Sequence, residues 1–168
     1  GNAGKYRSEI ESDYHRIIRS ASFRRLQDKT QVFPLDHSDF VRTRLTHSLE
    51  VSSIAKLIGK QVCMQVLEQQ RSPVEDAPDS LKVIEILNCA GLLHDIGNPP
   101  FGHFGESAIR NWFETNLSHL DYKGKPLMAW LDEQQAADLL YYEGNAQALR
   151  IITKLHRLTG RSGMYLTS

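Results

Sequence analysis

The chain has few of the features that would place it in a specialised class of protein. It contains only two cysteines in 168 residues, and Cys63 and Cys89 stand singly in separate apolar stretches. They therefore form neither a disulfide framework nor a CxxC metal site. No apolar run reaches the roughly 18 residues that a membrane-spanning helix needs, and the N-terminal stretch lacks an apolar signal-peptide core. We expect a reducing, cytoplasmic location and no membrane partner.

The chain also lacks an excess of either charge. Its 20 basic and 20 acidic residues give a net charge of zero, so any anion-binding site must be local rather than a property of the whole surface. The hydrophobic share of 40% and the charged share of 24% are typical of globular proteins. We expect one domain over residues 1–168, with an internal polar linker over residues 68–80.

Apolar residues recur along most of the chain at steps of three and four, which is the period of an amphipathic helix. No alternation typical of strands persists, so we predict an all-α fold, a helical bundle. Ser12 is a candidate N-cap for the first helix. The stretch from Leu81 to Asp95 is apolar on nearly every side, which predicts a buried helix. The predicted helices cover residues 11–27, 43–67, 81–95, 104–117, 128–142 and 144–158.

The predicted buried helix ends in His94 and Asp95. Burying an ionised aspartate without a partner is very costly, and a bound divalent cation would remove that cost. Neutral imidazole and carboxylate suit Mn, Fe, Co, Ni, Zn or, less well, Mg. His47, near the start of another apolar helix, is the leading candidate for a further ligand. An alternative from the residues alone is a capping histidine followed by a turn.

The next stretch, GNPPFGHFGE, places His103 between two glycines and three residues before Glu106. Residues three apart share one face of a helix. A histidine oriented by a carboxylate is suited to proton transfer or to holding an attacking water. The alternative is structural, with Glu106 interacting favourably with a helix N-terminus.

Arg44 lies one helical turn before His47, so its guanidinium could bind a phosphate that also contacts the ion. A solvated arginine on an exposed turn is the alternative. A wider set of basic residues has two interpretations, a solvated helix face or a contact with a neighbouring subunit or nucleic acid. This set comprises Arg16, Arg19, Arg24, Arg25 and Lys29.

Four blocks of the sequence closely resemble one family, the bacterial deoxyguanosine triphosphate triphosphohydrolases of the HD-domain phosphohydrolase superfamily. These blocks are RRLQDKTQVFPL, VRTRLTHSLEV, LLHDIGNPPFGHFGE and YYEGNAQALR, and they span Arg24 to Arg150 in the family's order. The resemblance implies an HD-domain helical bundle that hydrolyses dGTP, or dNTPs, to deoxynucleoside and inorganic triphosphate with a divalent metal ion. It implies metal ligation by His47, His94 and Asp95, catalysis by His103 and Glu106, and a nucleoside contact from Gln31.

The family pattern requires a fourth metal ligand, an aspartate well beyond the EGNAQ block. Only 21 residues follow Gln147 (168 − 147), and none is aspartate. We therefore expect the chain to be the N-terminal part of a longer enzyme, forming a homo-oligomer, with single-stranded nucleic acid as a candidate effector. Two alternatives stay open. One is an HD phosphohydrolase for another nucleotide, and the other is a nucleotide-binding or assembly module without turnover.

Overall fold

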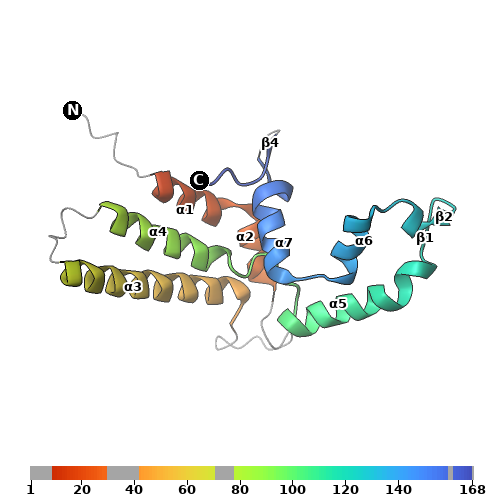
Figure 1. Ribbon diagram of the computed structural model, residues 1–168, viewed down its shortest axis with the longest axis horizontal. Helices are drawn as coiled ribbons and strands as arrows, with labels where there is room; N and C mark the ends of the chain where they lie inside the picture. Colours follow the sequence, from red (N-terminus) through yellow and green to blue (C-terminus); the bar gives the residue numbers. More distant parts are fainter. Residues whose placement is uncertain (1–8, 30–41, 71–77, 159–160, 168) are drawn as a thin grey trace.

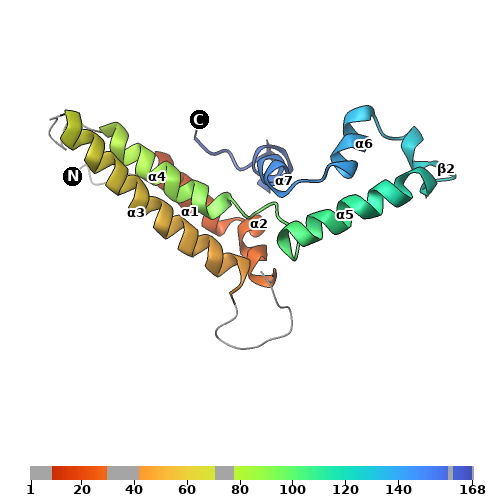
Figure 2. The same ribbon diagram turned by 60° about the horizontal axis from the view of Figure 1, so that its bottom comes forward.

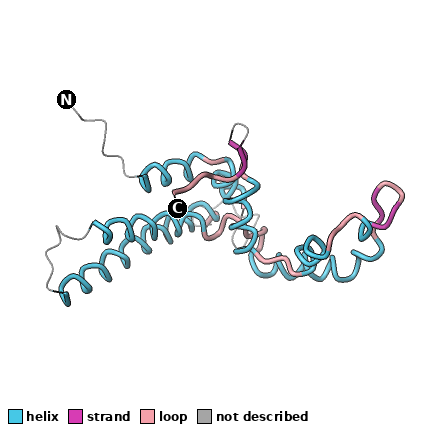
Figure 3. The backbone as a smooth tube through the Cα atoms, turned by 45° about the horizontal axis from the view of Figure 1, so that its top comes forward, coloured by secondary structure: helices cyan, strands magenta, loops and turns pink. Residues whose placement is uncertain are grey.

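The computed structural model describes residues 9–29, 42–70, 78–158 and 161–167. Within these ranges helices dominate (Figures 1 and 3), which confirms the all-α prediction. The seven α-helices in the described part are α1 (Glu9–Arg19), α2 (Ala21–Arg24), α3 (Arg44–Gln70), α4 (Pro78–Leu93), α5 (Gly102–Asn116), α6 (Glu133–Leu140) and α7 (Gly144–Arg150). The 3-10 turns are η1 (Arg25–Asp28), η3 (Leu117–His119) and η4 (Leu127–Ala129), and η5 (Ile151–Leu155) is a π-helical turn.

The helices form two groups that meet at α7. Helices α1, α3 and α4 run side by side, while α5 leads away from the end of α4 and carries α6 and a small hairpin (Figures 1 and 2). Strands β1 (Asp121–Tyr122) and β2 (Lys125–Pro126) make that antiparallel hairpin. Strands β3 (Arg157–Leu158) and β4 (Arg161–Ser162) pair in the same way near the C-terminus. None of the described helices is both long enough and apolar enough to cross a membrane.

The first predicted helix is broken at Ser20. The Ser20 hydroxyl accepts a hydrogen bond from the N–H of Phe23, so Ser20 ends α1 and caps α2. The prediction that Ser12 caps the helix is wrong, because α1 begins at Glu9 and Ser12 lies inside it. This break turns the chain so that Phe23 and Leu26 both point into the core.

Small residues bring α3 and α4 into close contact. A Cβ atom added to Gly91 would lie 2.5 Å from the Cα of Ser52, and one added to Gly59 would lie 2.7 Å from the Leu87 side chain. The Ser52 hydroxyl donates to the backbone carbonyl of Asn88 at 2.8 Å. The two helices therefore pack backbone to backbone, which aligns the start of α3 with the end of α4.

The expectation that residues 81–95 are buried on all sides is wrong. Helix α4 packs against α1 and α3, but Leu81, Val83 and Ile86 point elsewhere and are 67%, 45% and 53% exposed. Two neighbouring helices cannot cover the full circumference of a third. Only the C-terminal half of α4, which contains Cys89 and Leu92, is buried on the side of the core.

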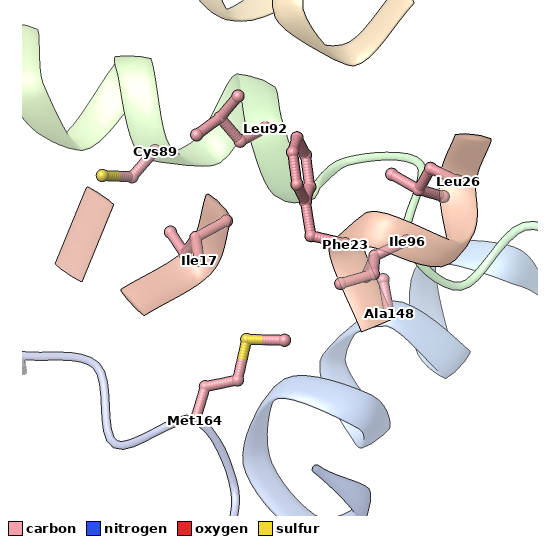
Figure 4. Packing of buried hydrophobic residues seen from close by; sticks show 8 residues of the cluster. All are labelled: Ile17, Phe23, Leu26, Cys89, Leu92, Ile96, Ala148 and Met164. Carbon is pink, nitrogen blue, oxygen red and sulfur yellow. The ribbon is translucent and has the colours of Figure 1, made fainter. Parts of the chain in front are cut away.

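The hydrophobic core joins the beginning, middle and end of the chain (Figure 4). Met164 is fully buried, and its N–H donates to the carbonyl of Ile152 at 2.6 Å. Nearby, the N–H of Thr167 donates to the buried carboxylate of Asp13 at 2.6 Å, which ties the C-terminal segment to α1. The core consists of Ile17, Phe23, Leu26, Cys89, Leu92, Ile96, Ala148 and Met164.

Two predicted helices are shorter than the sequence suggests. In residues 128–142 the α-helix is confined to α6, because Asp132 and Gln135 make a capping box that starts the helix there. In residues 144–158 the α-helix gives way at Ile151 to the π-helical turn η5. Residues 68–70 of the predicted linker over residues 68–80 belong to α3, residues 78–80 belong to α4, and residues 71–77 lie outside the described ranges.

Candidate metal and acid–base site

The start of α3 and the end of α4 bring three potential metal ligands together. One ligand atom each from His47, His94 and Asp95 lies within 4.8 Å of the others. The two imidazole rings are 5.2 Å apart, centroid to centroid, with planes at 67°. The close packing of α3 against α4 brings these residues together, because Gly91, where the two backbones nearly touch, lies one turn before His94.

The orientation of His94 suits metal binding. Its Nδ1 lies 2.8 Å from the carbonyl oxygen of Gly91. A carbonyl can only accept, so Nδ1 carries the proton and Nε2 keeps its lone pair. Nε2 lies 3.7 Å from Asp95 Oδ1, on the side where an ion would contact both residues. A backbone partner of this kind is the usual way a ligating histidine is held in position.

Asp95 is a buried carboxylate with a buried counter-ion. Its side chain is 6% exposed, and its Oδ2 lies 2.8 Å from Nη1 of Arg44, whose side chain is 4% exposed. Asn98 Nδ2 donates to the other carboxylate oxygen, Oδ1. Arg44 is therefore part of the site, but in this structure its direct partner is Asp95. Its second terminal nitrogen lies 3.1 Å from where a Cβ of Gly102 would stand.

The predicted proton-transfer pair is assembled at the start of α5. His103 Nδ1 lies 2.9 Å from Glu106 Oε2, with the histidine side chain 92% exposed and the glutamate side chain 4% exposed. Phe101 and Gly102, at φ 65° and 55°, take the left-handed conformation. The carboxylate is buried and held in place, whereas the imidazole faces outward.

A lysine approaches the site from the segment that follows η1. Lys29 Nζ donates to the backbone carbonyl of Asn98 at 3.0 Å, and the Lys29 carbonyl accepts from the N–H of Arg44 at 3.0 Å. Burial and the neighbouring Arg44 charge lower the pKa of Lys29, while Asp95 opposes this shift. The sequence placed Lys29 only in a general basic cluster, because its spacing to the site residues carries no periodic signal.

The first residue of α7 and the two residues before it supply contacts that the sequence analysis did not assign. The N–H of Gly144 donates to Glu106 Oε1 at 2.9 Å, and the Tyr142 hydroxyl donates to the carbonyl of Gly97 at 3.2 Å. Burial, followed by the nearby Glu106 charge, raises the pKa of Tyr142. Glu143 caps α7 by accepting from the N–H of Ala146 at 2.7 Å. The only sequence signal for these contacts is the resemblance of the block YYEGNAQ to the family. That resemblance does not indicate a role for each residue.

Gln31, the predicted nucleoside contact, lies outside the described residues. Glu50, one turn after His47 on α3, does not join the site and forms an exposed ion pair with Arg42 at 3.3 Å. The described centre is thus built from residues 44–47, 94–106 and 142–144, together with Lys29.

The comparisons with known proteins agree with this geometry. The model of the HD domain matches residues 44–159, which is more than half of the chain and includes each described ligand. The chain belongs to the HD domain family. HD domains bind divalent metals, and the donor set of this one, two imidazoles and a buried carboxylate, fits such an ion.

Individual relatives match over most of this HD-domain chain. It is 56% identical over 161 residues to a deoxyguanosinetriphosphate triphosphohydrolase-like protein of Listeria monocytogenes, covering 96% of this chain and 35% of that protein. It is 46% identical over 157 residues to a probable deoxyguanosinetriphosphate triphosphohydrolase of Pseudomonas aeruginosa, covering 89% and 30%. A deoxyguanosinetriphosphate triphosphohydrolase of Klebsiella pneumoniae is 42% identical over 170 residues, with 89% and 33% covered. The chain thus spans about a third of the length of the curated relatives it matches.

Proposed function

We propose that this HD domain supplies the metal-binding and acid–base part of an enzyme that hydrolyses dGTP, or dNTPs generally, to deoxynucleoside and inorganic triphosphate. One observation carries the proposal. The turn over residues 96–101 connects the cluster of His47, His94 and Asp95 directly to the hydrogen-bonded pair of His103 and Glu106. The names of the relatives support the choice of nucleotide.

The three ligand residues would hold a divalent ion, with Mn, Mg, Fe, Co, Ni and Zn as the candidates. Such an ion would polarise a phosphoryl oxygen and stabilise charge that develops there. Arg44 would contact the same phosphate, because its guanidinium lies between Asp95 and the backbone of Gly102. Lys29 lies beside it and adds positive charge to this side of the site.

His103 would handle the proton of the attacking water or of the leaving oxygen. Its Nδ1 donates to Glu106, so the lone pair of its exposed Nε2 is available to a substrate. Glu106 holds the ring in position through this hydrogen bond. Gln31 would contact the nucleoside, which places the α-phosphate near the metal ligands. Attack on the α-phosphorus then expels the 5′ oxygen and leaves the three phosphates joined.

Hydrolysis in ¹⁸O-water tests this reaction in a polypeptide of the relatives' full length that contains this sequence. The expected products of dGTP are deoxyguanosine and labelled triphosphate, detected by mass spectrometry. Label in orthophosphate or pyrophosphate, with dGDP or dGMP remaining, would show that the substrate binds in another register. A panel of other nucleotides in the same assay tests the alternative of a different HD phosphohydrolase.

The remaining expectations belong to the same proposal. The longer protein would act in the cytoplasm as a homo-oligomer, with single-stranded nucleic acid as a candidate effector. A second function, nucleotide binding or assembly without turnover, is favoured by the three-member ligand group found in the described part. Metal content measured alongside turnover separates the two, since a bound ion without turnover supports the second.

A further inference from the structure

The first residue of α7 contacts both halves of the site. Gly144 donates its N–H to Glu106 Oε1 at 2.9 Å. A Cβ atom at position 144 would lie 1.8 Å from Asn98 Oδ1 and 2.7 Å from Glu106 Oε1. Non-bonded carbon and oxygen atoms essentially never lie this close together, so a side chain at position 144 must displace Asn98, Glu106 or α7 itself.

The backbone beneath this contact is equally close. A Cβ at Gly97 would lie 2.1 Å from the N atom of Ala148 and 2.2 Å from the carbonyl oxygen of Gly144. Tyr142 adds a hydrogen bond from its hydroxyl to the carbonyl of Gly97 at 3.2 Å. The start of α7 therefore rests directly on the turn that follows His94 and Asp95, and it cannot shift without moving that turn.

On the proton-transfer side, both oxygens of Glu106 have a partner. Oε1 accepts from the N–H of Gly144, and Oε2 accepts from Nδ1 of His103. Glu106 is 3% exposed, so water offers little substitute for either bond. The backbone donor of Gly144 determines where Oε2 lies, and Oε2 in turn determines which nitrogen of His103 carries the proton.

On the metal side, Asn98 connects the same glycine to Asp95. The side-chain Nδ2 of Asn98 donates to Asp95 Oδ1, and the backbone carbonyl of Asn98 accepts from Lys29 Nζ at 3.0 Å. Its Oδ1 occupies the space that a side chain at Gly144 would need. Partners that orient a ligating carboxylate in this way typically change metal affinity by ~10–100-fold when they are removed.

We propose that Asn98 and Gly144 are a pair of positioning residues that hold the metal-binding half and the proton-transfer half of the site in one relative arrangement. Asn98 orients Asp95, and Gly144 orients Glu106 and, through it, His103. The absence of a side chain at position 144 lets both interactions exist together. The inference rests on the proposed function for its catalytic meaning, but its structural content can be measured without turnover.

The test compares Gly144→Ala with Asn98→Ala and with Asn145→Ala, an exposed neighbour on α7. Two quantities are measured on the chain: the affinity for Mn²⁺ by titration calorimetry, and the tautomer of His103 from ¹⁵N chemical shifts in metal-free protein. Gly144→Ala should weaken Mn²⁺ binding at least tenfold and reduce the Nδ1–H tautomer. Asn98→Ala should weaken Mn²⁺ binding similarly but leave the tautomer unchanged. Asn145→Ala should change neither.

Mn²⁺ affinity within twofold of the unsubstituted chain in either Gly144→Ala or Asn98→Ala would overturn the inference, as would an unchanged tautomer in Gly144→Ala. If Gly144→Ala does not fold, Asn98→Ala decides, because this substitution removes atoms without adding any. An Mn²⁺ affinity of Asn98→Ala equal to that of the unsubstituted chain would then overturn the inference. A failure of the proposed function has a different signature. Turnover of the longer protein would then survive His103→Ala, whatever the tautomer and Mn²⁺ measurements show.

Discussion

Asp95 and Arg44 form a buried ion pair, with Oδ2 and Nη1 2.8 Å apart and both side chains at most 6% exposed. Taking either partner away leaves the other charge inside the protein without compensation. We expect Arg44→Met to lower the free energy of unfolding by about 3–5 kcal/mol in the metal-free chain. Denaturation by urea measures this change.

A surface pair provides the control for Arg44. Arg42 and Glu50 are 3.3 Å apart, with side chains 64% and 47% exposed. Arg42→Met should therefore cost less than about 1 kcal/mol. Equal effects of the Arg44 and Arg42 substitutions would show that burial does not govern the Arg44–Asp95 interaction.

The ligand group makes a direct prediction for metal binding. His94→Ala removes the nitrogen that faces Asp95, so Mn²⁺ affinity should fall at least tenfold, or about 1.4 kcal/mol. His119, an exposed residue of η3, is the matched control, and His119→Ala should bind Mn²⁺ as the unsubstituted chain does. Titration calorimetry measures both. Binding that survives His94→Ala and is lost in His119→Ala would place the ion elsewhere.

We expect His103 to affect turnover but not metal binding. In a polypeptide of the relatives' full length, His103→Ala should lower kcat by ~10²–10⁴, the usual contribution of a general acid–base group. Metal content should not change, because His103 is not one of the three ligand residues. Atomic absorption and steady-state kinetics measure the two effects. An unchanged kcat at saturating metal would remove His103 from the mechanism.

Glu143 makes the stability of α7 dependent on pH. Hydrogen bonds from the backbone N–H groups of Ala146 and Asn145 lower the pKa of Glu143 from its ordinary value of 4.5. A carboxyl with a lowered folded-state pKa stabilises the protein fully above its unfolded-state pKa, and this stabilisation is lost as pH falls through the folded-state value. Glu143→Gln should therefore destabilise the chain more at pH 7 than at pH 3. A difference in unfolding free energy that is independent of pH would contradict this role.

Much of the local structure was accessible from the sequence. Helices α3, α4 and α5 follow from apolar residues at three- and four-residue steps, and the structure begins α5 two residues before the predicted Phe104. The exact breaks were less accessible. Ser20 interrupts the first helix through a side-chain hydrogen bond, and a serine within an amphipathic pattern carries no unambiguous signal for that bond.

Most helical segments, and the residue types that could bind a metal or move a proton, are predictable from the sequence, because they depend on short-range backbone hydrogen bonding and on side-chain chemistry. Tertiary structure decided which of those residues meet. The Arg44–Asp95 pair depends on the close packing of α3 against α4, and the Gly144–Glu106 bond joins residues 38 positions apart. It also decided that Leu81 and Ile86 are exposed. The apolar period of a helix specifies a face but not the neighbour that covers it, since burial depends on contacts between segments distant in the chain.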